Sequence, residues 1–145
     1  LGQVEESAAL LRSATEVLHQ SSETTLACDL HQAFWSAQRG DLDDLQRQAE
    51  LAVEIVNSGG APSFVPDVAL AVAEMLERSH RPEAAADLVT ALHRHPLTHP
   101  LIYHRYRVLR DRVPDRPSPT RPVPPLELHD LTVRQIQELQ EATPA

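Results

Sequence analysis

The stretch Gly40-Asp-Leu-Asp-Asp-Leu45 decides the fold, because it separates two amphipathic segments by a single tight turn. Glycine tolerates the left-handed backbone conformation that closes a helix. Asp41 is then well placed to cap the next helix, and Asp43 and Asp44 are favourable in its first turn. The three aspartates lack the glycine and the distal glutamate of a calcium loop. The stretch therefore predicts an antiparallel helix hairpin.

Two related stretches flank it along the chain. Gly2-Gln-Val-Glu-Glu-Ser7 starts 38 residues before Gly40, and Ser79-His-Arg-Pro-Glu-Ala84 starts 39 residues after it. Each has a turn residue, an acidic start and a small or apolar residue five positions on. Recurrence at such a period is typical of stacked helix hairpins, which present extended surfaces to partners.

Apolar residues at helical spacing predict about six helices in this array. We expect them at residues 3–19, 25–39, 42–57, 66–78, from about 82 to 96, and 99–112. Thr98 would cap the sixth helix, whose expected inward residues are Leu101, Ile102, Val108 and Leu109. The hairpin partner of the first helix should lie before Leu1, outside this sequence, which would leave apolar surface of that helix uncovered. We therefore expect a piece of a longer array, a homodimer formed through that uncovered helix, or a swapped helix that covers it.

The C-terminal part of the chain differs from the array. Six of the twelve residues 114–125 are proline, which predicts an extended, stiff strap. A final helix is expected at residues 131–142, where Thr132 and Gln135 have capping-box spacing. Its narrow apolar stripe should dock on the array or on a partner. We thus divide the chain into an array that starts mid-repeat (1–113), a strap (114–125) and a docking helix (126–145).

The segment from Val68 to Pro96 resembles a tetratricopeptide repeat. It has the family's residue types in register at nine positions, which are Val68, Ala71, Val72, Met75, Ala84, Leu88, Ala91, Leu92 and Pro96. The units are longer than the ~34 residues of the standard repeat. They are similar to the C-terminal repeats of large bacterial signal-transduction ATPases and transcription activators of the maltose-regulator type. The resemblance covers residues 1–112 and implies a right-handed solenoid that senses an inducer or a partner protein.

By the geometry of that family, the first helix of each pair lines a concave groove. Phe34 and Trp35 are adjacent, so they cannot share one helix face, and one of them should lie in the core. The resemblance points to a partner-binding groove, although plain packing would explain the same positions equally well. The candidate groove residues are Phe34, Trp35, Gln38, Ala69, Ala73 and Glu74.

Composition restricts the function further. The net charge is −8, with −10 in residues 1–92 and +5 in residues 93–121, which argues against general nucleic-acid coating. The single cysteine, Cys28, excludes an intrachain disulfide, so a reducing compartment and a cytoplasmic location are expected. Neither a membrane-spanning run nor a signal pattern is present.

No motif for catalysis or for a cofactor appears. There is no Gly-x-x-x-x-Gly-Lys-Ser/Thr loop, no Gly-x-Ser-x-Gly elbow and no His-Glu-x-x-His helix. We therefore expect no enzyme activity and no cofactor.

An alternative function would involve residues 93–121. His93, His95, His99 and His104 could approach a zinc ion, although Pro96 and Pro100 should splay them and no cysteine accompanies them. A second set could stack on bases or bind phosphate through Arg105, Arg107, Arg110 and Arg112 with Tyr103 and Tyr106. The exposed face of a terminal helix explains that set as well.

The sequence as a whole favours a non-enzymatic protein-interaction or ligand-sensing module of a bacterial regulatory protein. The expected partner is a protein or peptide, or the chain's own C-terminal helix. A nucleic-acid or metal-binding role of the segment 93–121 is the alternative.

Overall fold

The computed structural model describes residues 2–17, 32–60, 64–95, 97 and 100–142, with the side chains of 12–17 excepted. Within these ranges all regular structure is helical, so the predicted all-α class is confirmed there. Residues 32–39 form the described part of one helix. The others are α1 (Gly2–Val17), α3 (Leu42–Asn57), α4 (Phe64–Arg78), α5 (Pro82–Ala91), α6 (Pro100–Arg112) and α7 (Pro125–Ala142).

Two helix hairpins follow one another, and their turns have the same backbone geometry. In the first, Gly40 has φ 73° and the amide of Asp41 donates to the carbonyl of Ser36 at 2.9 Å. In the second, His80 has φ 60° and the amide of Arg81 donates to the carbonyl of Leu76 at 2.9 Å. Both are Schellman closures, in which a left-handed residue ends the helix. The second turn is therefore centred on His80, one residue after Ser79.

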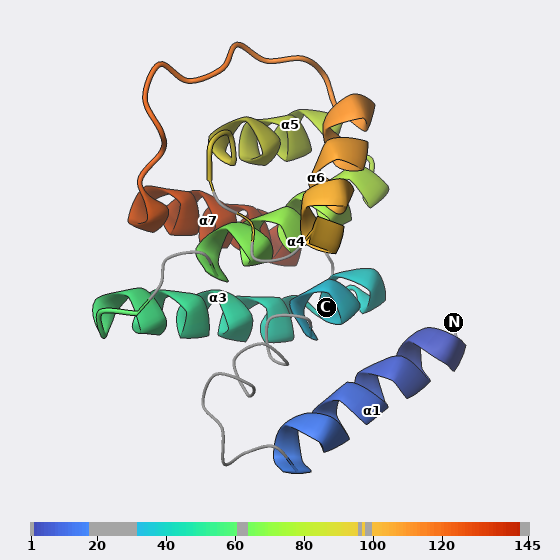
Figure 1. Ribbon diagram of the computed structural model, residues 1–145. Helices are drawn as coiled ribbons and strands as arrows, with labels where there is room; N and C mark the ends of the chain where they lie inside the picture. The colour runs from blue at the N-terminus through green and yellow to red at the C-terminus, as the bar shows by residue number, and fades with distance from the viewer. Residues whose placement is uncertain (1, 18–31, 61–63, 96, 98–99, 143–145) are drawn as a thin grey trace.

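Helix α4 lies at the centre of the molecule and contacts α3, α5, α6 and α7 (Figure 1). Every residue from Val65 to Ala73 is buried, which is why this helix lacks the polar face of a surface helix. It begins at Phe64, two residues before the predicted start at Pro66. Helix α5 ends at Ala91, earlier than predicted, and Arg94 turns the chain with φ 69°.

Helix α7 packs against α3, α4 and α5. It begins at Pro125, six residues before the predicted start, because proline is compatible with the first turn of a helix. The extra turn adds Leu128 to a buried stripe that continues through Thr132, Ile136 and Leu139. Thr132 is therefore not a cap. It lies within the helix, and its Oγ1 donates to the carbonyl of Leu128 at 2.8 Å.

Helix α6 crosses the end of the α4–α5 hairpin, and the proline-rich segment 113–124 then passes over α5 to reach α7 (Figure 1). Ile102 and Leu109 are buried as predicted, and Tyr106 joins them. The predictions for Leu101 and Val108 were wrong, since these side chains are 69% and 37% exposed. The helix covers α4 and α5 with one narrow face, so both residues remain at its edges.

Helix α1 differs from the rest in how little it buries. Ala8 is fully buried, whereas Leu10 is 71% exposed. An ion pair 4.0 Å long joins Glu5 of α1 to Arg39 at the end of the 32–39 helix. Predictions for Cys28 and for Thr98 and His99 fall outside the described residues.

Candidate functional site

A surface groove with a volume of about 290 Å³ lies between α4 and α6. One wall comes from the C-terminal half of α4, with Glu74, Glu77 and Arg78. The other comes from α6 and is formed by His104, Arg105, Val108, Leu109 and Arg112. These helices are the first members of their expected pairs. We call it the α4–α6 groove.

Arg105 organises the α4–α6 groove. Its Nε lies 3.1 Å from each carboxylate oxygen of Glu74, and its Nη2 lies 2.7 Å from Oε1. The guanidinium carbon also lies 4.5 Å from the centre of the Phe34 ring, a cation–π distance. Arg105 thus joins three helices, and the two-point pairing with Glu74 fixes the orientation of its planar group.

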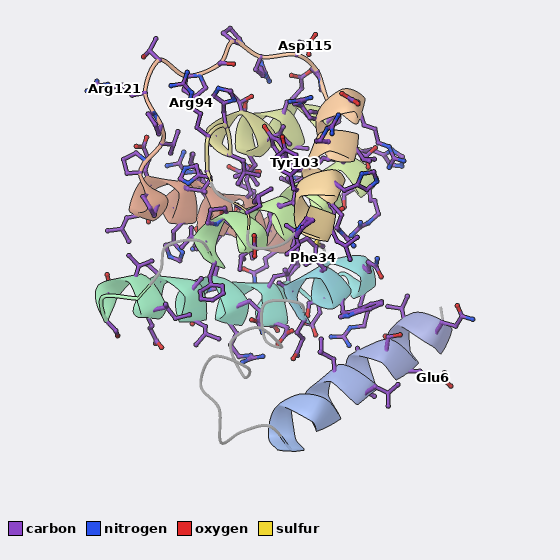
Figure 2. All side chains as sticks on the ribbon, viewed as in Figure 1. Glu6, Phe34, Arg94, Tyr103, Asp115 and Arg121 are labelled. Atoms are coloured by element: carbon purple, nitrogen blue, oxygen red, sulfur yellow. The ribbon has the colours of Figure 1, made fainter. Side chains whose placement is uncertain are left out.

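The six predicted groove residues separate into two sets. Phe34 (Figure 2) and Glu74 meet through Arg105 at the α4–α6 side. Trp35 is half-buried and Gln38 is exposed. Ala69 and Ala73, by contrast, have no exposed surface, because the helices packed against α4 cover it at these two positions. In this structure the two alanines belong to the core.

The four arginines of the predicted basic patch do not form one surface. Arg105 is paired with Glu74, and Arg112 lines the α4–α6 groove. Arg110 lines a different cavity, and Arg107 is exposed and lines neither. Their spacing along α6 spreads them around the helix instead of aligning them.

The histidines considered for the alternative metal-binding role are likewise separated. His93 lines the cavity that contains Arg110, whereas His104 lines the α4–α6 groove. His95 is half-buried, and His99 lies outside the described residues. In the part of the chain that the structure describes, no three His, Cys, Asp or Glu side chains are grouped so as to hold a metal ion.

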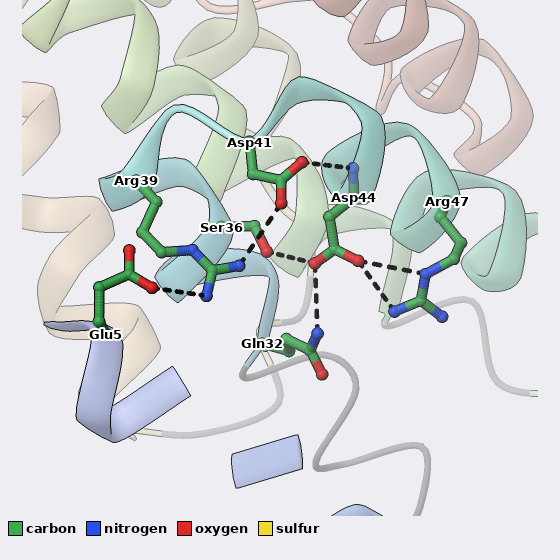
Figure 3. A network of polar contacts seen from close by, with 7 residues as sticks. All are labelled: Glu5, Gln32, Ser36, Arg39, Asp41, Asp44 and Arg47. Atoms are coloured by element: carbon green, nitrogen blue, oxygen red, sulfur yellow. Dashed lines mark hydrogen bonds and ion pairs between the residues drawn. The ribbon is translucent and has the colours of Figure 1, made fainter. Parts of the chain in front are cut away.

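A polar network at the first hairpin turn was not predicted (Figure 3). The carboxylate of Asp44 accepts hydrogen bonds from Ser36 Oγ, from Gln32 Nε2 at 3.3 Å and from Arg47 Nη2 at 3.0 Å. Asp41 caps α3 as expected, since its Oδ1 accepts from the amide of Asp44 at 3.1 Å. The signal in the sequence was the pair Gln32 and Ser36, which lie one helical turn apart.

The network changes the acidity of Asp44. Burial alone would raise the pKa of this carboxyl group, but hydrogen bonds from Ser36, Arg47 and Gln32 and the charge of Arg47 outweigh it. The pKa of Asp44 is therefore lower than that of an ordinary aspartate. The carboxylate stays ionised at neutral pH and joins the two helices of the hairpin, which suggests a structural role.

Comparison with known proteins found no match to this chain among family models, curated proteins or solved structures. A separate search of the described helices found none that is both long and apolar enough to cross a membrane.

Proposed function

We propose that this chain is a non-enzymatic interaction module, built as a tetratricopeptide-like array, that binds a protein or peptide segment in the α4–α6 groove. The observation that carries the proposal is the groove itself, formed by the first helices of successive pairs and organised by Arg105. The role in a bacterial regulator and the right-handed solenoid geometry are proposed from the sequence resemblance, and the cytoplasmic location from the single cysteine.

The chemistry of the α4–α6 groove suggests what kind of segment fits. Val108, 37% exposed, lines the groove and offers an apolar contact. Arg78 and Arg112 border it, whereas the positive charge of Arg105 is engaged by Glu74. Arginines at a groove edge bind carboxylates through two hydrogen bonds. We therefore expect a peptide with an apolar residue next to an acidic one.

A displayed random-peptide library tests this proposal, because selection from it requires no named partner. The wild-type chain should enrich peptides that combine an apolar and an acidic residue. The double variant Val108→Asp, Arg112→Glu should bind those peptides at least about tenfold more weakly, since an apolar contact and a charge pair are both lost.

Arg107→Glu is the matched control, because Arg107 lies on the same helix, is exposed and does not line the groove. It should retain the peptides that the wild-type chain selects. Equal binding by the groove variant and the control, or no enrichment by the wild-type chain, would refute the α4–α6 groove as a binding site.

A further inference from the structure

A second cavity, of about 210 Å³, lies beneath the proline-rich segment 113–124, where that segment leaves α6 and passes α5. It shares no lining residue with the α4–α6 groove. Val89 of α5 and Val113 supply apolar walls, and both are largely buried. Pockets for drug-sized ligands begin at about 300 Å³, so this one suits a smaller molecule.

The wall of the cavity formed by the proline-rich segment is held in place by Arg116. Its Nη2 lies 2.5 Å from the carboxylate of Glu83 and 3.5 Å from that of Asp87, both on α5. The charge of Arg116 is thus already engaged. Its ion pairs, together with the stiffness of the prolines, keep the segment above α5 and leave the cavity open.

Two opposite charges border the cavity without neutralising each other. Arg110 comes from the last turn of α6. Asp115 comes from the proline-rich segment (Figure 2). Among the described residues, neither has an opposite charge within ion-pair distance, and they are not paired with each other. The Arg110 guanidinium lies 5.9 Å from the centre of the Tyr106 ring, which also lines the cavity.

Other hydrogen-bonding groups complete the lining. The hydroxyl of Ser118 and the imidazole of His93 are part of it. Burial raises the pKa of the Tyr106 phenol, so its hydroxyl remains a donor at neutral pH. The cavity therefore combines one unpaired cation, one unpaired anion, several further polar groups and two apolar walls within a small volume.

The geometry points to a binding site for a free α-amino acid with an apolar side chain. Its carboxylate pairs with Arg110 and its ammonium group with Asp115, while its side chain lies against Val89 and Val113. A zwitterion uses both unpaired charges at once, whereas a simple anion leaves Asp115 close to a like charge. Binding would also join α6 to the proline-rich segment, the connection that leads to α7.

Calorimetric titration of the full chain tests this inference with L-leucine and two analogues. One analogue, 4-methylpentanoate, lacks the ammonium group, and the other, isopentylamine, lacks the carboxylate. L-leucine should bind with a dissociation constant below about 10 mM, and each analogue at least about tenfold more weakly, because one charged contact is lost. Inorganic phosphate serves as the probe for a site that selects only negative charge.

Substitutions identify the site. Arg110→Ala and Asp115→Asn should each weaken L-leucine binding at least about tenfold. Arg107→Ala and Asp111→Asn are matched controls on α6, since both residues are exposed and neither lines the cavity. Circular dichroism verifies that all four variants are folded.

Three results would overturn the inference. They are the absence of saturable L-leucine binding, equal binding of L-leucine and 4-methylpentanoate, and equal losses in the site and control variants. Stronger binding of phosphate than of L-leucine would also contradict it. None of these results bears on peptide binding in the α4–α6 groove, because the two sites share no residue.

Discussion

The two hairpin turns have one backbone geometry but different side chains. At the first, the left-handed residue is Gly40, and Asp41 caps α3 with its carboxylate. At the second, the left-handed residue is His80, and the cap position holds Arg81, whose side chain makes no capping hydrogen bond. Pro82 follows and fixes the first helical residue of α5.

The difference shows that a Schellman closure determines where the helix ends. The side chains around the turn determine how much the hairpin is stabilised. Around the first turn, Asp44 joins the two helices through buried Ser36 and Gln32. Around the second, buried α4 residues such as Leu76 hold the helices together. The first hairpin should therefore lose stability when its polar groups are removed. The second should gain stability when a capping side chain is added.

Removal of the Asp44 carboxylate should have the largest effect. Asp44→Ala leaves the Ser36 hydroxyl, with no exposed surface, and the Gln32 amide, 4% exposed, without this acceptor. The free energy of unfolding should fall by about 2–3 kcal/mol, the cost of unsatisfied buried polar groups. Urea denaturation measures it. Glu54→Ala, at an exposed position of the same helix, is the control, and an equal loss there would contradict a special role of Asp44.

Acid should weaken the same contacts in the wild-type chain. The pKa of Asp44 is lowered in the folded state, so its stabilisation is fully present above the ordinary aspartate pKa of about 3.9. It is lost as the pH falls through the lower folded-state value. Asp44→Asn should show a smaller loss of stability below about pH 4 than the wild-type chain. Parallel stability curves for the two proteins over that range would exclude this coupling.

Gly40→Ala tests the backbone requirement of the first turn. A Cβ atom at φ 73° costs about 1–2 kcal/mol, although its nearest neighbour, the Met75 Cε atom, would lie at an ordinary contact distance of 4.0 Å. Thermal unfolding should show a lower midpoint for this variant. Gly2→Ala, at a position with open space and no positive φ, should be neutral or slightly stabilising. If both alanines have the same effect, the left-handed conformation is not what makes Gly40 necessary.

Arg81→Asp places at the second turn the same capping residue that Asp41 provides at the first. An aspartate at this position can accept a hydrogen bond from the first turn of α5, as Asp41 does in α3, and should stabilise the fold by about 1 kcal/mol. Arg81→Ala removes the charge without adding an acceptor. The prediction fails if the alanine and aspartate variants have the same unfolding midpoint.

His80→Gly should give the smallest gain, about 0.5 kcal/mol, since glycine adopts φ 60° without the Cβ cost but loses more entropy on folding. Chemical denaturation of wild-type and variant chains resolves a difference of this size when several repeats are averaged. A destabilised variant would mean that the His80 side chain contributes contacts that outweigh its backbone strain.

Local features of this fold could be predicted from the sequence. The glycine closure at Gly40, the cap at Asp41 and the start of α5 at Pro82 each depend on a residue and its immediate neighbours. The all-helical class followed from apolar spacing that is equally local. The start of α7 was harder to predict from the sequence. Thr132 interrupts the apolar stripe, so the extension of that stripe to Leu128 is not evident.

Features that depend on packing could not be derived in this way. Ala69 and Ala73 have the residue type of a groove, and only the covering helices reveal that they are buried. The pairing of Arg105 with Glu74 joins residues 31 positions apart, and the sequence offers other arginines and acids at similar separations. The contacts of the α4–α6 groove therefore became visible only in three dimensions.

The docking of α7 has a consequence for the order in which the molecule folds. Gln140 near its end donates to Asp43 across 97 positions, so this contact closes a very long loop. During synthesis, the apolar surfaces of α3, α4 and α5 emerge from the ribosome well before Leu128 and Ile136 are available to cover them. Non-local closure of this kind slows folding and prolongs the exposure of aggregation-prone surface. The nascent chain should therefore depend on chaperones until its proline-rich segment has been made and α7 can pack.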